Sequence, residues 1–311
     1  KLVKMGHKVI VIDNFSIGRK SNLKNIKNKI KIYNKDISNF KSIKNLFKKV
    51  DNVFHLAALA DIVPSIENPD DYFRVNVTGT YNVLKLSIKN KIKRFVYSAS
   101  SSCYGIPKHY PTKETSSIEP QYPYALTKRL GEELVLHFAK VYKLNASSLR
   151  FFNVYGPRAR TSGTYGAVFG VFLAQKIAKK PFTIVGNGKQ TRDFTFVSDI
   201  VGAIINVSKK RNLIGEIFNV GSGSTVSVNK IVKLLKGPKV KIPKRPGEPD
   251  VTFACIKKIR RKTGWKPKIP IEKGIKFMLQ HIDDWKHAPI WTPKTISKQT
   301  KKWFYYLGKE N

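Results

Sequence analysis

The chain has 311 residues, with 59 Lys and Arg against 20 Asp and Glu, so its formal net charge at pH 7 is +39. A chain of this length can bury one large core or two adjoining lobes. No apolar stretch is long enough to span a bilayer, and no Cys/His spacing typical of zinc occurs, so we predict neither a membrane partner nor a metal. Cys103 and Cys255 lie far apart in the sequence, which argues for a reducing, cytoplasmic compartment rather than a disulfide framework.

A basic chain can bind nucleic acid or another anionic surface. Here lysine carries most of the charge, and the lysines are scattered along the chain rather than gathered in one tail. Lysine, asparagine and isoleucine are also the residues that an AT-rich coding sequence supplies. We therefore favour compositional drift over a nucleic-acid partner, although a basic surface still attracts an anionic substrate.

Strands and helices alternate through the first ninety residues. Residues 1–8 look like the end of a helix, with Gly6 as its stop signal. Asp13, with Asn14 beside it, follows a β-branched strand, and in dinucleotide-binding folds an acid at this point accepts hydrogen bonds from the adenosine ribose. His55 lies in a strand that ends in small residues, and we expect it to be packed or turned away. The predicted strands are residues 9–12, 30–33 and 53–58, and the predicted helix is residues 71–89.

A strand, a serine cluster and a helix follow one another between residues 94 and 128. The apolar strand, residues 94–98, leads to Ser100, Ser101 and Ser102. After a polar loop, Tyr124 and Lys128 begin a helix, and their spacing of four puts both on one face. A nearby ammonium favours the phenolate form. A shift of about three units from the ordinary tyrosine pKa, or about 4 kcal/mol, would give a base at neutral pH.

The Tyr-x-x-x-Lys spacing alone is weak evidence in a chain so rich in lysine. It recurs at Tyr81/Lys85, Tyr104/Lys108 and Tyr305/Lys309, where an exposed helical pair is the simpler interpretation. Tyr124 differs in its context, because a strand that ends in serines precedes it and a helix opens on it. The sequence therefore predicts that Ser100, Tyr124 and Lys128 converge.

The composition changes near Tyr155, after a predicted strand at residues 146–152. The alternation up to that strand predicts a doubly wound parallel sheet. Helices are predicted at residues 166–179 and from residue 196, the second returning to the core. The tail, residues 282–311, contains aromatic residues that we expect to pack on the second lobe or at a partner interface. Further strands are predicted at 182–185 and 218–220, and loops at 158–163 and 245–250.

Three motifs resemble the extended short-chain dehydrogenase/reductase family, and most closely its nucleotide-sugar branch, typified by UDP-galactose 4-epimerase. They are residues 97–105 (YSASSSCYG), 124–128 (YALTK) and 150–157 (RFFNVYGP), and the resemblance extends at least to Pro267. It implies an α/β fold with a Rossmann-like sheet and a smaller C-terminal α/β substrate lobe. The NAD-binding domain would span residues 1–152, with 196–207 returning to it, and residues 153–311 would mainly form the nucleotide-sugar lobe.

The resemblance also implies a mechanism of transient oxidation at C4 of a hexose. Tyr124 takes the proton of the 4-hydroxyl while the C4 hydride passes to NAD. Lys128 lowers the pKa of Tyr124 and holds the nicotinamide ribose, and Ser100 hydrogen-bonds the reacting oxygen. The 4-keto sugar turns over, and the hydride returns to the opposite face.

Further binding residues are implied by position in the family motifs. NAD would be held by Tyr124, Lys128 and residues near the strand ends, namely Asp13, Asn14, Asp36, Ile37, Leu56, Ala57, Ala58, Asn76 and Ser98. The nucleotide sugar would be held by Ser100, Asn153, Val168, Arg192, Arg245 and Glu248. Arginine suits a diphosphate because its planar fork donates bidentately, although a surface ion pair is the simpler role for either arginine. The resemblance implies that about 20–25 residues, with the first strand and its glycine-rich turn, precede Lys1.

Residues next to Ser100 bear on the choice among sister activities. Family dehydratases have Asp-Glu where this chain has Ser101-Ser102, and hydroxyls cannot replace that acid and base. Decarboxylases have Glu, and 3,5-epimerases Cys, at the position of Ser102, whereas Cys103 would point the other way on an extended segment. C4 epimerisation of a UDP-glucose or UDP-N-acetylglucosamine type of substrate therefore leads. Thr252 aligns with the position whose bulk excludes N-acetylated sugars in the family, so the resemblance implies that its small side chain admits an N-acetyl group.

The alternatives are another nucleotide-sugar modification, a catalytically silent nucleic-acid-binding relative, or an inert fragment. The family further implies a cytoplasmic homodimer with a role in polysaccharide biosynthesis.

Overall fold

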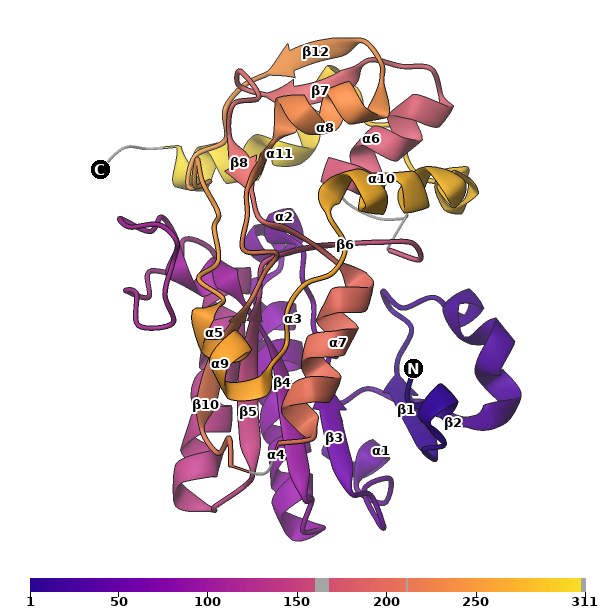
Figure 1. The fold of residues 1–311 in the computed structure, drawn as a ribbon, viewed down its shortest axis with the longest axis vertical. Helices are drawn as coiled ribbons and strands as arrows, with labels where there is room; N and C mark the ends of the chain where they lie inside the picture. Colours follow the sequence, from indigo (N-terminus) through magenta and orange to yellow (C-terminus); the bar gives the residue numbers. More distant parts are fainter. Residues whose placement is uncertain (160–167, 211, 309–311) are drawn as a thin grey trace.

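The larger lobe is built on a parallel sheet whose strands lie in the order β10, β5, β4, β3 (Figure 1). This computed structural model describes residues 1–159, 168–210 and 212–308. Each neighbouring pair in the sheet is parallel, so all four carboxyl ends lie at one edge. The strands are β3 (Asn52–His55), β4 (Arg94–Ser100), β5 (Ala146–Phe151) and β10 (Glu216–Val220).

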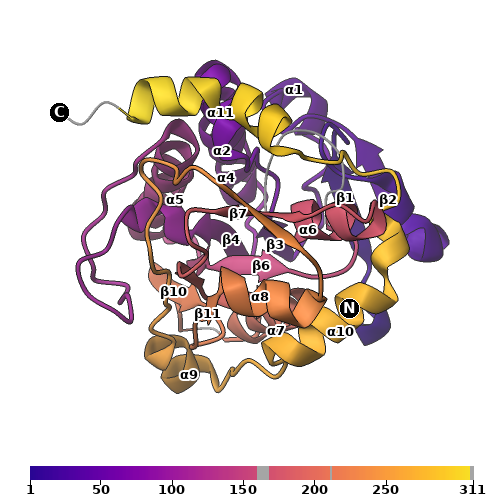
Figure 2. The ribbon, with the colours of Figure 1, turned by 90° about the horizontal axis from the view of Figure 1, so that it is seen from above.

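Helices cover both faces of this sheet, as its apolar strands require. Phe95, Tyr97 and Ala99 of β4 pack in one apolar cluster with helices α4 (Gly79–Lys89) and α5 (Pro123–Val141). Val96 points to the opposite face and packs in a second cluster with α7 (Val197–Ser208). Figures 1 and 2 show α4 and α5 on one side and α7 on the other. The predicted doubly wound, Rossmann-like α/β fold is confirmed.

A second parallel pair, β1 (Val9–Asp13) and β2 (Ile30–Asn34), lies beside the sheet. Among the described residues no hydrogen-bonded strand joins β1 to β3. The strand predicted to precede Lys1 stays a prediction. Short helical elements link these strands: η1 (Val3–Met5), η2 (Lys20–Lys29), α1 (Phe40–Ile43), α2 (Ile62–Glu67), α3 (Pro69–Phe73), the π turn η3 (Arg74–Thr78) and η4 (Ser101–Tyr104).

The smaller lobe packs paired strands and helices around its own core, which includes Phe172, Ile231, Met278 and Trp285. β6 pairs with β9 and β7 with β12 in parallel, whereas β8 and β11 are antiparallel. Its strands are β6 (Asn153–Tyr155), β7 (Phe182–Val185), β8 (Thr191–Arg192), β9 (Phe194–Phe196), β11 (Val226–Ser227) and β12 (Lys239–Ile242). Its helices are α6 (Val168–Ile177), α8 (Val228–Leu235), α10 (Ile271–Gln280), η5 (Ile282–Trp285) and α11 (Pro293–Leu307).

The predicted elements differ from the observed ones mainly at their ends. β3 stops at His55, so residues 56–58 extend beyond it, and the predicted helix at 71–89 is α3, η3 and α4 in succession. The first two residues of the helix predicted at 166–179, and residues 160–163 of the predicted loop, lie outside the described residues. β10 and α9 (Lys257–Thr263) also pack with the larger lobe, so more of the chain returns to it than residues 196–207.

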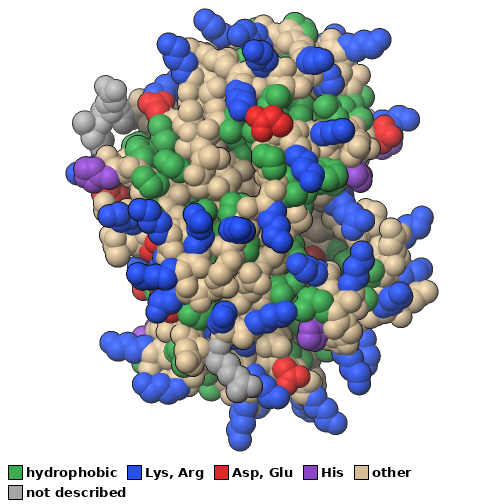
Figure 3. Space-filling view, in the orientation of Figure 1, with side chains coloured by type: hydrophobic (Ala, Val, Ile, Leu, Met, Phe, Trp, Pro, Cys, Tyr) green, Lys and Arg blue, Asp and Glu red, His purple; other side chains and the backbone are tan. Residues whose placement is uncertain are grey.

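Lysine and arginine side chains are spread over the face shown in Figure 3, with apolar and uncharged side chains between them. No helix in the described part of the chain is both long and apolar enough to cross a bilayer. Within the same residues, no group of three His, Cys, Asp or Glu side chains is placed to bind a metal ion.

A buried ion pair joins α5 to the sheet. Glu132 accepts hydrogen bonds from the Arg150 guanidinium, at 2.6 Å from Nη2, and from the Ser148 hydroxyl at 2.9 Å. Both charged side chains are almost fully buried. Tyr104 and Arg129 complete the network through Arg150 and Glu132, respectively. Satisfying a buried carboxylate in this way fixes how α5 lies on β5.

We predict that Glu132→Gln lowers the free energy of unfolding by about 3–5 kcal/mol, because it leaves the Arg150 charge buried without its counter-ion. Urea unfolding at an unchanged m-value measures the shift. Glu133→Gln is the matched control, since Glu133 is half exposed beside Arg129 and its loss costs less than about 1 kcal/mol. Equal shifts in the two variants would contradict the prediction.

Candidate active site

The carboxyl edge of the sheet brings Ser100, Tyr124 and Lys128 together. Ser100 ends β4, and its side chain caps the next turn by accepting from Ser102 N at 3.2 Å. Pro123 occupies the first position of α5, so Tyr124 and Lys128 lie in the first two turns. The Ser100 hydroxyl lies near the Tyr124 phenol and acts to lower its pKa, and Lys128 Nζ lies 4.3 Å from the centre of the Tyr97 ring.

A chain of hydroxyl groups connects Tyr124 to the neighbouring loop. Ser100 Oγ donates to Ser102 Oγ at 3.0 Å, and the Ser102 hydroxyl lies near the Tyr122 phenol, where it partly offsets the rise that burial causes in the Tyr122 pKa. The rings of Tyr122 and Tyr124 are stacked, with centroids 6.4 Å apart. Tyr122 was not among the predicted site residues. Its position two residues before Tyr124, at the start of the same helix, is the feature of the sequence that could have indicated a role. The backbone of Tyr122 is still extended at that point.

Burial dominates the acid–base properties of the site. It raises the pKa of Tyr124 above its ordinary value, and the nearby Ser100 hydroxyl opposes this only in part. Burial also lowers the pKa of Lys128 to about 7, against the opposing charge of Glu132. The expected lowering of the Tyr124 pKa by Lys128 is not found in this arrangement, because the ammonium lies over Tyr97 and burial favours the neutral forms of both groups.

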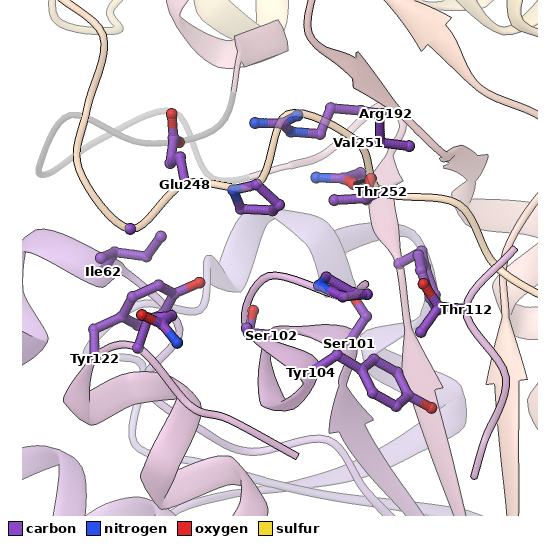
Figure 4. Close-up of a pocket in the computed structure, with 17 residues that line it drawn as sticks. Ile62, Ser101, Ser102, Tyr104, Thr112, Tyr122, Arg192, Glu248, Val251 and Thr252 are labelled. Carbon is purple, nitrogen blue, oxygen red and sulfur yellow. Dashed lines mark hydrogen bonds between the residues drawn. The ribbon is translucent and has the colours of Figure 1, made fainter. Parts of the chain in front are cut away.

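A pocket lies between the two lobes next to these residues (Figure 4). Ser101, Ser102 and Tyr122 contribute from the larger lobe, facing Arg192, Glu248 and Thr252 of the smaller lobe. Ser100 and Tyr124 lie behind Ser102 and Tyr122 rather than in the pocket lining. The pocket therefore presents hydroxyl groups on one side and an arginine on the other.

Two of the predicted substrate residues are held by neighbours in the pocket wall. Arg192 Nη1 donates to the backbone carbonyls of Thr191 at 2.9 Å and Asp250 at 3.4 Å, and burial lowers its pKa. Asn153 Oδ1 accepts from the Thr252 hydroxyl at 2.8 Å. These bonds orient an arginine and an amide toward one cavity.

The other predicted substrate residues lie differently. Arg245 pairs with Glu248 at 3.1 Å, but only Glu248 lines the pocket. Val168 begins α6 and packs against the core of the smaller lobe, outside the pocket lining. Direct roles for Arg245 and Val168 in substrate binding stay predictions.

Acidic and amide groups meet at the ends of β1 and β2, where the adenosine ribose of NAD is predicted to bind. Asp13 Oδ1 accepts from Phe15 N at 2.7 Å, and no described residue donates to its Oδ2. Asn14 donates to Asp36 at 3.2 Å. Burial would raise the pKa of Asp36, but hydrogen bonds from Ser38 and Asn14 and the charge of Arg74 lower it. A carboxylate with an acceptor oxygen at this edge fits ribose hydroxyls.

The remaining predicted NAD residues divide into surface and supporting positions. Leu56 is exposed and Ala57 and Ala58 are partly exposed just beyond β3, where their small size leaves the backbone open to a cofactor. Asn76 is buried, and its amide binds both backbone groups of Leu59 and the Thr127 hydroxyl, so it holds the loop to α5. Ile37 packs in the core, and Ser98 lies in β4.

Two other reactive residues are excluded from acid–base chemistry by burial. His55 packs between the rings of Phe95 and Tyr97 and hydrogen-bonds Thr80 at 2.8 Å. Burial lowers its pKa to about 3, so it is neutral, as its predicted packed position requires. Burial also raises the pKa of the Cys103 thiol to about 12.

A doubly wound sheet with serine, tyrosine and lysine at its carboxyl edge, and a pocket facing an arginine, defines the extended short-chain dehydrogenase/reductase class of NAD-dependent nucleotide-sugar enzymes. Residues 1–278 match the family described as GDP-mannose 4,6 dehydratase, and the chain belongs to that family. The match ends before η5 and α11.

Relatives of the chain include several epimerases. A putative UDP-glucose 4-epimerase of Methanocaldococcus jannaschii is 34% identical over 89% of this chain and 90% of its own. The structure of Thermotoga maritima UDP-glucose 4-epimerase with UDP-glucose is 32% identical, with a TM-score of 0.84 over 91% of this chain and 93% of its own. The structure of Bacillus cereus UDP-glucuronic acid 4-epimerase, in complex with UDP-glucuronic acid and NAD, is 28% identical to this chain. Its TM-score is 0.84, and the match covers 91% of this chain and 93% of the epimerase chain.

We predict that Lys128→Met stabilises the protein, and more so at pH 6 than at pH 9.5. Between about pH 7 and the ordinary lysine pKa of about 10.4, the unfolded chain keeps a proton that the folded chain releases. The free energy of unfolding therefore falls as the pH is lowered through this window, by an amount on the order of 1–3 kcal/mol. The Lys128→Met variant has no ammonium to bury, so its stability does not show this fall. Thermal unfolding at both pH values measures it.

Lys85→Met is the matched control for this test. Lys85 has the same spacing from Tyr81 but is exposed on α4. We expect no pH-dependent gain in stability from Lys85→Met. A gain equal to that of Lys128→Met would refute the conclusion that burial of Lys128 causes the effect.

Proposed function

We propose that this protein epimerises C4 of a UDP-hexose, of the UDP-glucose or UDP-N-acetylglucosamine type, through a transient 4-keto sugar with NAD. The observation that carries the proposal is the convergence of Ser100, Tyr124 and Lys128 beside a pocket whose opposite wall contains Arg192. The larger lobe would bind NAD, and the smaller lobe, mainly from residue 153 onward, would bind the nucleotide sugar.

The side chains at the carboxyl edge of the sheet accept and return the proton of the 4-hydroxyl. Ser100 hydrogen-bonds the reacting oxygen, and Tyr124 takes the proton as C4 becomes a ketone and returns it when C4 is reduced on the opposite face. When bound, NAD supplies the acceptor for the hydride of C4 and a positive nicotinamide ring. A cation beside Tyr124 lowers its pKa, which burial alone keeps high. Lys128 holds the ribose hydroxyls of the cofactor.

The pocket wall keeps the diphosphate in place while the keto sugar turns. Arg192 and Asn153 supply donors for the phosphate oxygens, and Glu248 accepts from the ribose of the nucleotide. Arg245 contributes charge next to Glu248. Anchoring far from C4 lets the sugar present either face without leaving the site.

Sister reactions require an acid or base that the pocket does not offer at Ser101 and Ser102. Their hydroxyls can orient a sugar but cannot exchange protons at C5 or C6 at neutral pH. Dehydration and decarboxylation are for this reason the weaker proposals.

We expect the protein to convert both UDP-glucose and UDP-N-acetylglucosamine into their C4 epimers when NAD is present. Replacing the C2 hydroxyl by an N-acetyl group should change kcat/KM by less than about tenfold, because the small Thr252 side chain leaves room in the pocket. Proton NMR of the reaction mixture resolves the epimers. Complete rejection of the N-acetyl sugar would exclude the proposed role of Thr252, and loss of C4 epimerisation with both sugars would exclude the proposed function.

The catalytic assignment is tested in the same assay with Tyr124→Phe, which removes the proton acceptor and should lower kcat by about 10²–10⁴-fold. Tyr81→Phe is the control, because Tyr81 has the same spacing to a lysine and its side chain is exposed on α4. It should keep kcat within about twofold of the parent.

We further propose that the protein is a cytoplasmic homodimer that supplies sugars for polysaccharide synthesis. Support for association comes from exposed aromatic and aliphatic side chains on α4 and the end of α5, namely Tyr81, Val141 and the adjoining Tyr142. Sedimentation velocity should give twice the mass of the chain, and a Tyr142→Lys variant should sediment as the monomer. A monomeric parent would rule the dimer out.

A further inference from the structure

The C-terminal helix α11 lies against both lobes. Its N-terminus is capped by Thr292, whose side chain accepts from Thr295 N, and its buried face presents Ile296, Thr300 and Trp303. The helix contacts α2 of the larger lobe, and Figure 2 shows it crossing above that helix. The helix α11 thus contacts α2 of the larger lobe and also packs into the core of the smaller lobe through Ile296.

Two contacts connect the end of α11 to the loop at residues 245–248, and Leu307 lies near a glycine of the same loop. The Trp303 indole Nε1 donates to the backbone carbonyl of Pro246 at 2.8 Å. The Arg245 guanidinium carbon lies 5.3 Å from the centre of the Trp303 ring. A Cβ built on Gly247 would lie 3.7 Å from Leu307 Cδ1, so the last turn of the helix lies directly behind that glycine.

The same loop forms part of the pocket. Gly247 and Glu248 line it, together with Pro249. Arg245 is held on one side by Glu248, at 3.1 Å, and on the other by the Trp303 ring. Gly247 has a φ of +69°, which permits the sharp turn between the two faces of the loop. The loop therefore has α11 on one side and the pocket on the other.

We propose that Trp303 is a positioning residue for nucleotide binding, which acts by holding the Pro246 carbonyl and the Arg245 side chain so that Glu248 faces the pocket. The inference rests on the proposed function, because it assumes that this pocket binds the nucleotide of the sugar substrate. Its chemical target is a uridine diphosphate, whose ribose and phosphates would meet Glu248 and the nearby arginines.

A second buried tryptophan provides the comparison that a purely structural role requires. Trp285 is fully buried in the core of the smaller lobe. Its Nε1 has no hydrogen-bond partner among the described residues. Replacing either indole by phenyl removes similar buried volume, but only at Trp303 does it remove a hydrogen bond to the pocket loop.

The test uses the full chain, with UDP as the binding probe in calorimetry and UDP-glucose as the substrate. Trp303→Phe should weaken UDP binding and raise KM by about fivefold, the equivalent of one lost hydrogen bond of about 1 kcal/mol, with kcat within about twofold. Trp285→Phe should leave both constants within about twofold. Leu307→Ala, which removes the contact behind Gly247 and leaves the indole in place, should weaken UDP binding by about threefold.

The outcomes separate the two proposals. Unchanged UDP affinity in folded Trp303→Phe, or equal losses in Trp303→Phe and Trp285→Phe, overturns the role of Trp303 while turnover by the parent leaves the proposed function intact. If Trp303→Phe does not fold, Leu307→Ala decides, and unchanged affinity in that variant overturns the inference. A parent protein that neither binds UDP nor epimerises its sugars overturns both proposals.

Discussion

The buried pair of Glu132 and Arg150 is the interaction on which the geometry of the site depends. It joins α5 to β5, and the same helix carries Lys128 one turn earlier and Tyr124 two turns earlier. Because a buried carboxylate without partners is costly, the helix has little freedom to rotate or slide on the sheet. The charge of Glu132 also favours the protonated form of Lys128 against its burial. One pair thus sets both the position and the electrostatics of the catalytic helix.

Acidic residues are scarce in this basic chain, and the buried ones accept hydrogen bonds that join distant segments of it. Asp193 follows Arg192 and accepts from Ser222 N and Oγ, and from the backbone of Gly223 and Ala254. Asp199 similarly accepts from the backbone N–H groups of Lys268 and Ile269. Each carboxylate gathers donors from distant segments, because burial without them would raise its energy by several kcal/mol. Asp193 thus holds the segment that carries Arg192 into the pocket wall, although the ligand of that pocket is expected to be an anion.

The two lobes meet around the pocket, and neither one forms it alone. Hydroxyl groups come from the end of β4 and the start of α5, whereas Arg192, Glu248 and Thr252 come from the smaller lobe. The interlobe contact of α11 with α2 lies close by, since Ile62 at the start of α2 also lines the pocket. In the proposed function, proton chemistry would therefore fall to side chains of one lobe and substrate anchoring mainly to side chains of the other.

The doubly wound sheet and the candidate triad could be predicted from the residues alone, because apolar alternation, the serine cluster and the Tyr-x-x-x-Lys helix are local patterns. The sequence also marked Asn153, Arg192 and Glu248, which share one pocket although they lie far apart in the chain. Three features emerge from the folded chain instead: Tyr122 and Ser102 lie beside Ser100 and Tyr124, burial raises the pKa of Tyr124, and Trp303 hydrogen-bonds the loop at residues 245–248. These features depend on contacts between distant segments and on the exclusion of water, which no local pattern encodes.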